Sequence, residues 1–495
     1  MLLSSSLTPL VRQLQHFAER SHAAFYTPGH KRGTGASNAI KQLLGDRLFA
    51  ADLPELPGLD TLFNPEGVIQ DAQQLAAQTF GADQSWFLAN GSTCGIEAAV
   101  LATCKPGDRL IVPRNLHQSV VSALILGGVT PVFVAPDADD ALGIAHGVSV
   151  HTLQTALDKY PDVAAVMVTY PTYYGVGCDV GAIAHLVHQH GIPLLVDEAH
   201  GAHFGFHPDL PPSALSQGAD LTVQSTHKVL AALTQASMLH IQGDRISPER
   251  VSRALQLVQS SSPSYLLLAS LDAARAQMQD HGHELMAHTL SLAQHAREAI
   301  APIPGIKLFE LDTPSNSAAA ILDPTRLTVD VSGLGITGFD ADEQLHEELG
   351  VTAELPGLKT LTFIISLGNT AEDVEHLVRS LQVLSERCPS PFECSPLDYA
   401  NSSPALPSID RVSVPAVSPR DAFFAENEPV AIAQAIGRIS AELVCPYPPG
   451  IPVLLPGERV TAEAVQLLQE VSDAGGIITG CADSDLTALT VVRED

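Results

Sequence analysis

The sequence predicts an α/β protein: a large domain built on a mostly parallel, doubly wound sheet, then a small α/β domain and a C-terminal α+β domain. From about residue 70 to residue 245, segments with helical periodicity alternate with short apolar runs that end in turn residues. This pattern is typical of parallel strands covered by helices. Most of the runs are too short and too uniformly apolar to be half-exposed, so we expect buried strands. The expected strands cover residues 85–88, 109–112, 131–134, 164–169, 193–196 and 221–224.

The length of 495 residues, at roughly 150 residues per domain, allows two to four domains. We expect an N-terminal segment over residues 1–70, a large domain over 71–309 and a small domain over 310–387 with a strand near 361–365. Residues 388–417 are dense in Pro and Ser and are predicted to form an irregular connector. A C-terminal domain follows over 418–495, with a helix predicted over residues 429–439.

The chain is strongly acidic, with 26 Lys and Arg against 55 Asp and Glu and a net charge of −29. This balance excludes a bulk nucleic-acid binder, because polyanions are held through Lys and Arg. Only 16% of the residues are charged, so the acidity reflects scarce basic residues more than abundant acids. Either surface solubility or the attraction of a cationic substrate explains it.

Other features of the composition indicate a cytoplasmic protein. Seven cysteines without a CxxC pair fit a reducing compartment better than a disulfide framework. The N-terminus lacks the basic region and long apolar core of a signal peptide. The most apolar stretch, residues 119–136, is interrupted by Gly127, Gly128 and Pro131. We therefore expect a soluble chain with neither a membrane nor a nucleic-acid partner.

Polar residues follow the expected strands at the edge where an open α/β sheet binds its ligands. Asn90-Gly91-Ser92-Thr93 enters a helical run and can bind a phosphate, although an ordinary helix cap is the simpler interpretation. His117 follows the second strand, and Tyr173-Tyr174 follows the fourth. Asp197 follows the fifth strand and needs a cation or a metal, because a buried carboxylate is costly unless it is paired. Lys228 follows the sixth strand and is either a Schiff-base amine or a solvated lysine.

Together, a phosphate-binding loop, an imidazole, an acid and a lysine at different strand ends match the needs of pyridoxal 5'-phosphate. The lysine would carry the cofactor as an imine, and the acid would keep its pyridine nitrogen protonated. Competing motifs fail, since Asp197-Glu198-Ala199-His200 looks like a helicase box but no GxxxxGK[ST] loop exists. His283 and His288 are five residues apart, whereas the HExxH motif needs four, so no metal site is predicted.

These residues resemble the fold-type-I pyridoxal-phosphate-dependent decarboxylases of ornithine, lysine and arginine. The matching blocks occur in order along nearly the whole chain, so chance does not explain the match. They are Tyr26-Thr27-Pro28-Gly29-His30-Lys31, Asn90-Gly91-Ser92-Thr93, Pro113-Arg114-Asn115-Leu116-His117, Pro171-Thr172-Tyr173, Asp197-Glu198-Ala199-His200-Gly201, Ser225-Thr226-His227-Lys228 and Tyr447-Pro448-Pro449-Gly450-Ile451-Pro452. Because the first block comes so early, the chain resembles the shorter members without an N-terminal wing domain.

The resemblance implies catalytic roles for Lys228, Asp197, His227 and His117. Lys228 would bind the cofactor covalently, and Asp197 would pair with its pyridinium nitrogen. His117 would stack on one face of the cofactor ring, while Ala199 would pack against the other face.

Further roles are implied around the rest of the cofactor. Ser92, Thr93, Ser225 and His227 would hold the phosphate, with His227 also close to the imine. His200 would lie near the phenolic oxygen of the ring. The resemblance also implies a homodimer, or an oligomer built from dimers, with active sites at the interface.

The implied reaction is the decarboxylation of a cationic amino acid to CO2 and an amine of polyamine biosynthesis. Arginine or lysine ranks ahead of ornithine as the substrate. The product would be agmatine from arginine, cadaverine from lysine or putrescine from ornithine. Glu354 is a candidate partner for the distal cation of the substrate, or else an exposed glutamate without that role.

Two alternatives stay open at this point. An aminotransferase of the same fold clamps the substrate carboxylate with an arginine of the small domain, but no arginine lies between Leu327 and Val378. A non-catalytic, regulatory paralogue of a decarboxylase is the other alternative. The presence of both Lys228 and Asp197 argues against it, because a binding role needs neither.

Overall fold

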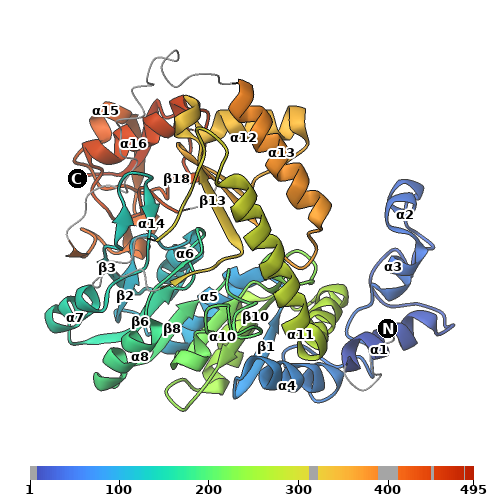
Figure 1. The fold of residues 1–495 in the computed structure, drawn as a ribbon. Helices are drawn as coiled ribbons and strands as arrows, with labels where there is room; N and C mark the ends of the chain where they lie inside the picture. Colours follow the sequence, from blue (N-terminus) through green and yellow to red (C-terminus); the bar gives the residue numbers. More distant parts are fainter. Residues whose placement is uncertain (1–7, 312–320, 388–410, 448–450, 484, 495) are drawn as a thin grey trace.

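The computed structural model describes residues 8–311, 321–387, 411–447, 451–483 and 485–494. Its centre is an eight-stranded sheet in the order β1-β10-β9-β8-β6-β2-β3-β16 (Figure 1). Strands β9, β8, β6, β2 and β3 are parallel, while β10 is antiparallel to both of its neighbours and β16 is antiparallel to β3. The predicted α/β class with a mostly parallel sheet is therefore confirmed.

The six predicted strands are all present, with ends that differ by at most one residue. Two further strands of this sheet, β10 and β16, were not predicted. The bounds are β1 (Gln84–Leu88), β2 (Arg109–Pro113), β3 (Thr130–Val134), β6 (Val163–Thr169), β8 (Leu194–Asp197), β9 (Leu221–Gln224), β10 (Ser237–Ile241) and β16 (Val412–Ser413).

Helices cover both faces of the large sheet because successive residues of each buried strand point to opposite sides. On β2, Leu110 and Val112 pack with α5, α6 and α10, whereas Ile111 packs with α7 and α8. Helix α5 lies very close to the sheet, since a Cβ on its Gly95 would come within 2.7 Å of Leu88 and Val223. The bounds are α4 (Val68–Phe80), α5 (Gly91–Thr103), α6 (Gln118–Gly127), α7 (Val150–Lys159), α8 (Val180–Gln189), α10 (Pro248–Val258) and α11 (Tyr265–Ile300).

A second, four-stranded sheet follows in the order β11-β13-β15-β14. The C-terminal half of the long helix α11 packs on it together with α12 and α13, so α11 belongs to the cores of both sheets. The bounds are β11 (Lys307–Leu308), β13 (Arg326–Asp330), β14 (Leu355–Pro356), β15 (Thr360–Ile364), α12 (Gly338–Leu349) and α13 (Ala371–Arg387). A short ladder of β7 (Val176–Gly177) with β12 (Ile321–Leu322) joins this part to the large sheet.

The C-terminal segment contains two short antiparallel ladders and packs around its own apolar core. Its elements are α14 (Pro419–Phe424), β17 (Asn427–Ala431), α15 (Ile432–Ala435), β18 (Cys445–Tyr447), α16 (Ala462–Asp473), β19 (Ile477–Thr479) and β20 (Ala488–Val492). The helix predicted over 429–439 is wrong. Its first residues form β17, which pairs with β20 along its whole length, and only 432–435 are helical.

The predicted irregular connector needs a second correction. Val412 and Ser413, near its end, form β16 and extend the large sheet by pairing with Val134 and Phe133 of β3. An edge strand of two residues has too little sequence pattern to be recognised, and its partner strand lies far away in the chain. The part of the connector over residues 388–410 lies outside the described residues.

The N-terminal segment begins with α1 (Pro9–Glu19), which packs against α4 and α11. Asp272 of α11 accepts hydrogen bonds from the first backbone N–H groups of α1, at Leu10 and Val11. By contrast, α2 (Asn38–Leu44) extends away from the rest of the molecule and buries none of its side chains (Figure 1), whereas α3 (Asp46–Ala51) packs against α1. Within the described residues, no helix has the combination of length and apolar character that a membrane crossing requires.

Candidate active site

A cavity lies at the carboxyl edge of the large sheet, where the sequence predicts a ligand site. Its walls come from the last residues of β6 and β8, the segments that follow β1, β2, β3, β6, β8 and β9, and one residue of the C-terminal segment. The lining residues are Ser92, Asn115, His117, Ala145, Thr169, Pro171, Thr172, Tyr173, Tyr174, Asp197, Ala199, His200, Lys228 and Ile451. The structure thus brings together Ser92, His117, Asp197, Ala199, His200 and Lys228 of the predicted site.

Lys228 lies on α9 (Thr226–Val229), a single helical turn that begins directly after β9. Its Nζ is 2.9 Å from Nε2 of His200 and 5.3 Å from the ring centre of Tyr173. Burial lowers the pKa of Lys228, and the negative charges of Asp197 and Glu354 oppose that shift. The unprotonated, nucleophilic amine is therefore easier to form here than on an exposed lysine.

Asp197 is the last residue of β8, and only 6% of it is exposed. Its Oδ1 accepts a 3.1 Å hydrogen bond from the backbone N–H of Ala199. Burial raises the pKa of Asp197, whereas the positive charge of Lys228 lowers it. A carboxylate in this position gains from a cationic partner inside the cavity.

His117 is the N-cap of α6 and also lines the cavity. Its Nδ1 accepts a hydrogen bond from the backbone N–H of Ser119 at 3.2 Å. Burial and the charge of Lys228 lower the pKa of His117 to about 4, so the ring is neutral near pH 7. His117 therefore caps a helix and lines the cavity at the same time.

The predicted phosphate ligands are only partly gathered at the cavity. Ser92, at the start of α5, lines it, and buried Ser225 donates a 2.8 Å hydrogen bond to Ser92 Oγ from behind. Thr93 is exposed, and Nδ1 of His227 is 3.0 Å from the carbonyl of Ala236. Among the described residues, Thr93, Ser225 and His227 are not part of the cavity wall, so their phosphate roles stay predictions.

The sequence analysis missed Arg326, the first residue of β13. It is 1% exposed, and its Nη2 is 3.2 Å from Nδ1 of His200 and 3.3 Å from the His200 carbonyl. The stretch without arginine was counted from Leu327, one residue too late to include it. Arg326 does not belong to the cavity wall formed by the described residues, and it lies behind His200.

Gly175 makes room for the stem of Arg326. A Cβ on Gly175 would lie 2.7 Å from Cγ of Arg326, and its φ of +83° is unfavourable for other residues. Gly175 directly follows the Tyr173-Tyr174 pair of the sequence analysis, so a glycine that could admit a close neighbour was visible in the sequence. The identity of that neighbour was not.

Glu354 is exposed and does not line the cavity among the described residues. It lies in an adjoining groove on the four-stranded sheet, which Asp373 and His376 also line. Its charge nevertheless raises the pKa of both Lys228 and Arg326, so it lies within electrostatic reach of the cavity. The structure therefore places Glu354 near the site but outside its wall.

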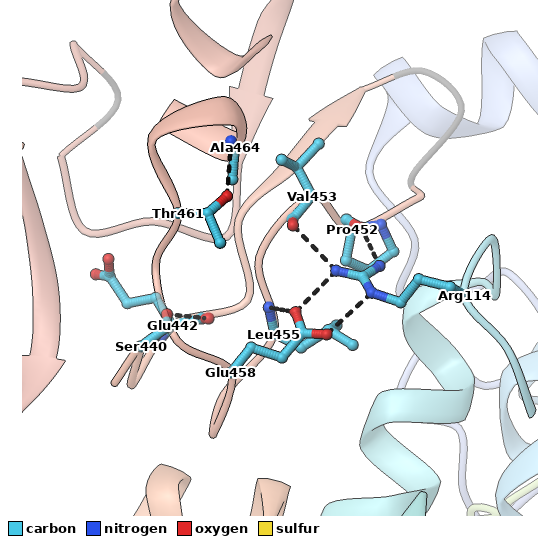
Figure 2. A network of polar contacts seen from close by, with 9 residues as sticks. All are labelled: Arg114, Ser440, Glu442, Pro452, Val453, Leu455, Glu458, Thr461 and Ala464. Atoms are coloured by element: carbon cyan, nitrogen blue, oxygen red, sulfur yellow. Dashed lines mark hydrogen bonds and ion pairs between the residues drawn. The ribbon is translucent and has the colours of Figure 1, made fainter. Parts of the chain in front are cut away.

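Ile451 lines the cavity from the C-terminal segment, and Arg114 holds the residues that follow Ile451 in place (Figure 2). Arg114 donates hydrogen bonds to the carbonyls of Pro452 and Val453, at 2.7 and 3.0 Å. It also forms a two-pronged ion pair with Glu458. One arginine after β2 thus fixes the C-terminal part of the cavity wall.

The residues present fit pyridoxal 5'-phosphate. A buried carboxylate that needs a cation, an amine with a lowered pKa and a hydroxyl at a helix N-terminus face one cavity. In addition, Oδ1 of the buried Asn115 has no hydrogen-bond partner among the described residues, although its Nδ2 donates to the carbonyl of His146. An unsatisfied buried acceptor at the cavity wall indicates a polar ligand there.

Comparisons with known proteins match one family along most of the chain. The family described as Orn/Lys/Arg decarboxylase, major domain, matches residues 8–391, and the C-terminal domain of that family matches residues 408–476. An arginine decarboxylase of Bacillus subtilis (strain 168) is 38% identical over 492 residues, which cover 99% of each chain. An arginine decarboxylase of Halalkalibacterium halodurans is 38% identical over 487 residues, 98% of each chain. The crystal structure of a Francisella novicida lysine decarboxylase has a TM-score of 0.83 and 24% identity, and the match covers 99% of this chain and 82% of that one.

Proposed function

The chain belongs to the Orn/Lys/Arg decarboxylase family and is an amino-acid decarboxylase, and we propose that it decarboxylates arginine to agmatine with pyridoxal 5'-phosphate. The observation that carries this proposal is the convergence of Lys228 and Asp197 on one cavity at the carboxyl edge of the sheet. The full-length relatives at 38% identity, which are named arginine decarboxylases, support arginine over lysine and ornithine.

Each residue at the cavity contributes a distinct physical effect to this reaction. When bound, pyridoxal phosphate accepts the electron pair that is left on Cα as the substrate carboxylate departs as CO2. Asp197 supplies a fixed negative charge that holds a cationic ring nitrogen. Lys228 supplies an amine whose pKa burial lowers, which favours the unprotonated form that would attack the cofactor carbonyl.

The neighbouring residues hold the reactants in place and keep water out. His117 and Ala199 line the cavity as a flat imidazole and a small methyl group, which suits the two faces of an aromatic ring. Ser92 presents its hydroxyl at the N-terminal end of α5, where the helix dipole favours a phosphate. Thr93, Ser225 and His227 complete this group in the proposal.

Decarboxylation requires that the substrate carboxylate is free to leave. An arginine that bound this carboxylate, as in an aminotransferase, would oppose its loss. Arg326 is the arginine of the four-stranded sheet nearest to the site, and it lies behind His200. Its position therefore favours carboxylate loss over the aminotransferase alternative. Glu354 is the proposed partner of the distal guanidinium, because its negative charge reaches the site from the adjoining groove.

The decisive experiment measures CO2 release from arginine, lysine and ornithine by the purified protein loaded with pyridoxal phosphate. We expect release with arginine to be fastest, and no release from the Lys228→Ala variant. Equal or faster release from lysine would overturn the choice of substrate. A keto-acid product without CO2 would identify an aminotransferase, and cofactor binding without any product would identify a regulatory paralogue.

We further propose that the protein acts as a homodimer in the cytoplasm. Residues 20–48, the N-terminal arm, carry five Lys and Arg but a single Asp in a chain whose net charge is −29. The arm also exposes apolar side chains, with Phe25 at 95% and Leu43 at 76% exposure. A cationic arm with exposed apolar groups suits the acidic surface of a second copy. The five cysteines of the described residues are free, as a reducing compartment allows.

A further inference from the structure

Arg326, His200 and Lys228 form a continuous hydrogen-bonded row that ends at the cavity. Nη2 of Arg326 is 3.2 Å from Nδ1 of His200, and Nε2 of the same ring is 2.9 Å from Nζ of Lys228. All three residues come from different parts of the fold: β13, the segment after β8, and α9. His200 is therefore held from both sides of its ring.

The row defines where the proton of His200 is. A guanidinium has donors and no acceptor, so Nδ1 of His200 must be the acceptor in its bond with Arg326. A neutral imidazole that accepts at Nδ1 carries its single proton at Nε2. The Nε2–H group therefore donates to Nζ of Lys228, and Nζ must offer a lone pair as a neutral amine.

The surroundings of His200 keep the ring neutral. Burial is the main reason that the pKa of His200 lies well below its ordinary value, and the positive charge of Arg326 lowers it further. The buried carboxylate of Asp323, close to Arg326, is occupied elsewhere: its Oδ2 is 3.0 Å from Nε2 of His203, and its Oδ1 accepts from Thr325. The tyrosine ring that packs on His200, Tyr173, brings no charge.

We propose that Arg326 is a positioning residue that holds His200 as the Nε2–H tautomer, so that His200 stabilises the unprotonated amine of Lys228. An Nε2–H donor cannot accept a proton from an ammonium group, so this tautomer disfavours the charged lysine. Without Arg326, the ring can place its proton on Nδ1 and accept from Nζ. The lysine ammonium then gains a hydrogen bond, and its pKa rises.

This inference rests on the proposed function only in explaining why an unprotonated Lys228 is useful, because the cofactor would bind to that amine. The tautomer itself is a property of the protein and can be measured without cofactor or turnover. Gly175 contributes to the same arrangement, since only a residue without a side chain leaves space for the aliphatic part of Arg326.

The test uses ¹⁵N-histidine-labelled protein without cofactor, with the His200→Gln variant to assign the ring signals. The wild type should show a protonated Nε2 and an unprotonated Nδ1 on His200. Arg326→Met should move the proton to Nδ1 or give a mixture, and Arg326→Lys should restore the wild-type pattern in part. Arg297→Met is the matched control: Arg297 binds the carbonyl of Arg326 but does not contact His200, so it should leave the tautomer unchanged.

A second readout is the pH dependence of the acetylation rate of Lys228 by trace acetic anhydride. Its midpoint should rise by about one pH unit in Arg326→Met and stay constant in Arg297→Met. The proposal is overturned by a protonated Nδ1 on His200 in the wild type, or by an unchanged tautomer and midpoint in folded Arg326→Met. A failed CO2 assay with the expected tautomer would refute the proposed function and leave this inference standing.

Discussion

Arg114 and Glu458 lie 344 positions apart in the chain and form a two-pronged ion pair, with contacts of 3.0 Å from Nε to Oε1 and 2.8 Å from Nη2 to Oε2. The side chain of Arg114 is only 5% exposed, and that of Glu458 is 17% exposed. Because Arg114 also binds two carbonyls beside Ile451, this pair connects the wall of the cavity to the C-terminal segment (Figure 2).

Breaking this pair should destabilise the protein. Glu458→Gln leaves the guanidinium of Arg114 largely buried without its counter-charge, and we expect the free energy of unfolding to fall by about 1–3 kcal/mol. The control is Glu348→Gln, which removes the partner of Arg387 from an exposed pair and should cost less than about 1 kcal/mol. Denaturant titration measures the free energy of unfolding of both variants. Equal losses would show that the Arg114–Glu458 pair stabilises the protein no more than an exposed ion pair does.

Asp197→Asn should reduce turnover while the protein stays folded. The amide keeps the shape of the carboxylate but supplies no charge to a cationic ring nitrogen, so we expect kcat to fall roughly 100- to 1000-fold. Asp220→Asn is the comparison, because Asp220 is equally buried but pairs with His188 and Arg245 away from the cavity. It should lower stability and spare kcat. Wild-type kcat in Asp197→Asn would contradict the proposed role.

Glu354→Gln should weaken the binding of arginine. We expect KM to rise about tenfold with a smaller change in kcat, because an attraction between unlike charges is lost. The pKa of Lys228 should also fall, since the charge of Glu354 raises it. Asp373→Asn, in the same groove, serves as the control. An unchanged KM for arginine in Glu354→Gln would exclude this residue as the distal partner.

Glu198 should make stability depend on pH. Burial raises its pKa from 4.5 to about 8, although N–H donors from Ala214 and Gln224 oppose the shift. Between pH 4.5 and 8, Glu198 retains a proton in the folded state that it releases in the unfolded state. The contribution of Glu198 to the free energy of unfolding is therefore highest below pH 4.5 and falls as the pH rises toward 8. The slope is at most about 1.4 kcal/mol per pH unit.

Glu198→Gln removes this titration, because the amide resembles the protonated acid. The stability of the wild type relative to Glu198→Gln should therefore fall between pH 5 and pH 8. Chemical denaturation at several pH values provides the comparison. Parallel curves for the two proteins would mean that Glu198 is ionised in the folded state over this whole range.

The net charge of −29 predicts a salt-dependent encounter with a cationic substrate. As salt is added, kcat/KM for arginine should fall several-fold, while kcat stays level. Inhibition by citrulline, the uncharged analogue of arginine, should change little under the same conditions. A flat kcat/KM would leave surface solubility as the explanation of the acidic composition.

Much of the site could be predicted because the relevant pattern is local. Short apolar runs identify parallel strands, and the carboxyl ends of parallel strands meet at one edge. The residues directly after them, such as His117, Asp197 and Lys228, therefore had to lie near one another. By the same reasoning, β16 was missed, because two residues of edge strand leave no periodic signal.

The sequence by itself thus determined the α/β class, the edge of the sheet that holds the cavity and most of the residues that line it. Only the tertiary structure decided which atoms meet there. The rotation of α5 exposes Thr93 and turns Ser92 inward, and the docking of the four-stranded sheet brings Arg326 of β13 to His200. Such contacts depend on how separate elements dock, and side-chain directions at a docked surface are set by long-range packing that no local pattern encodes.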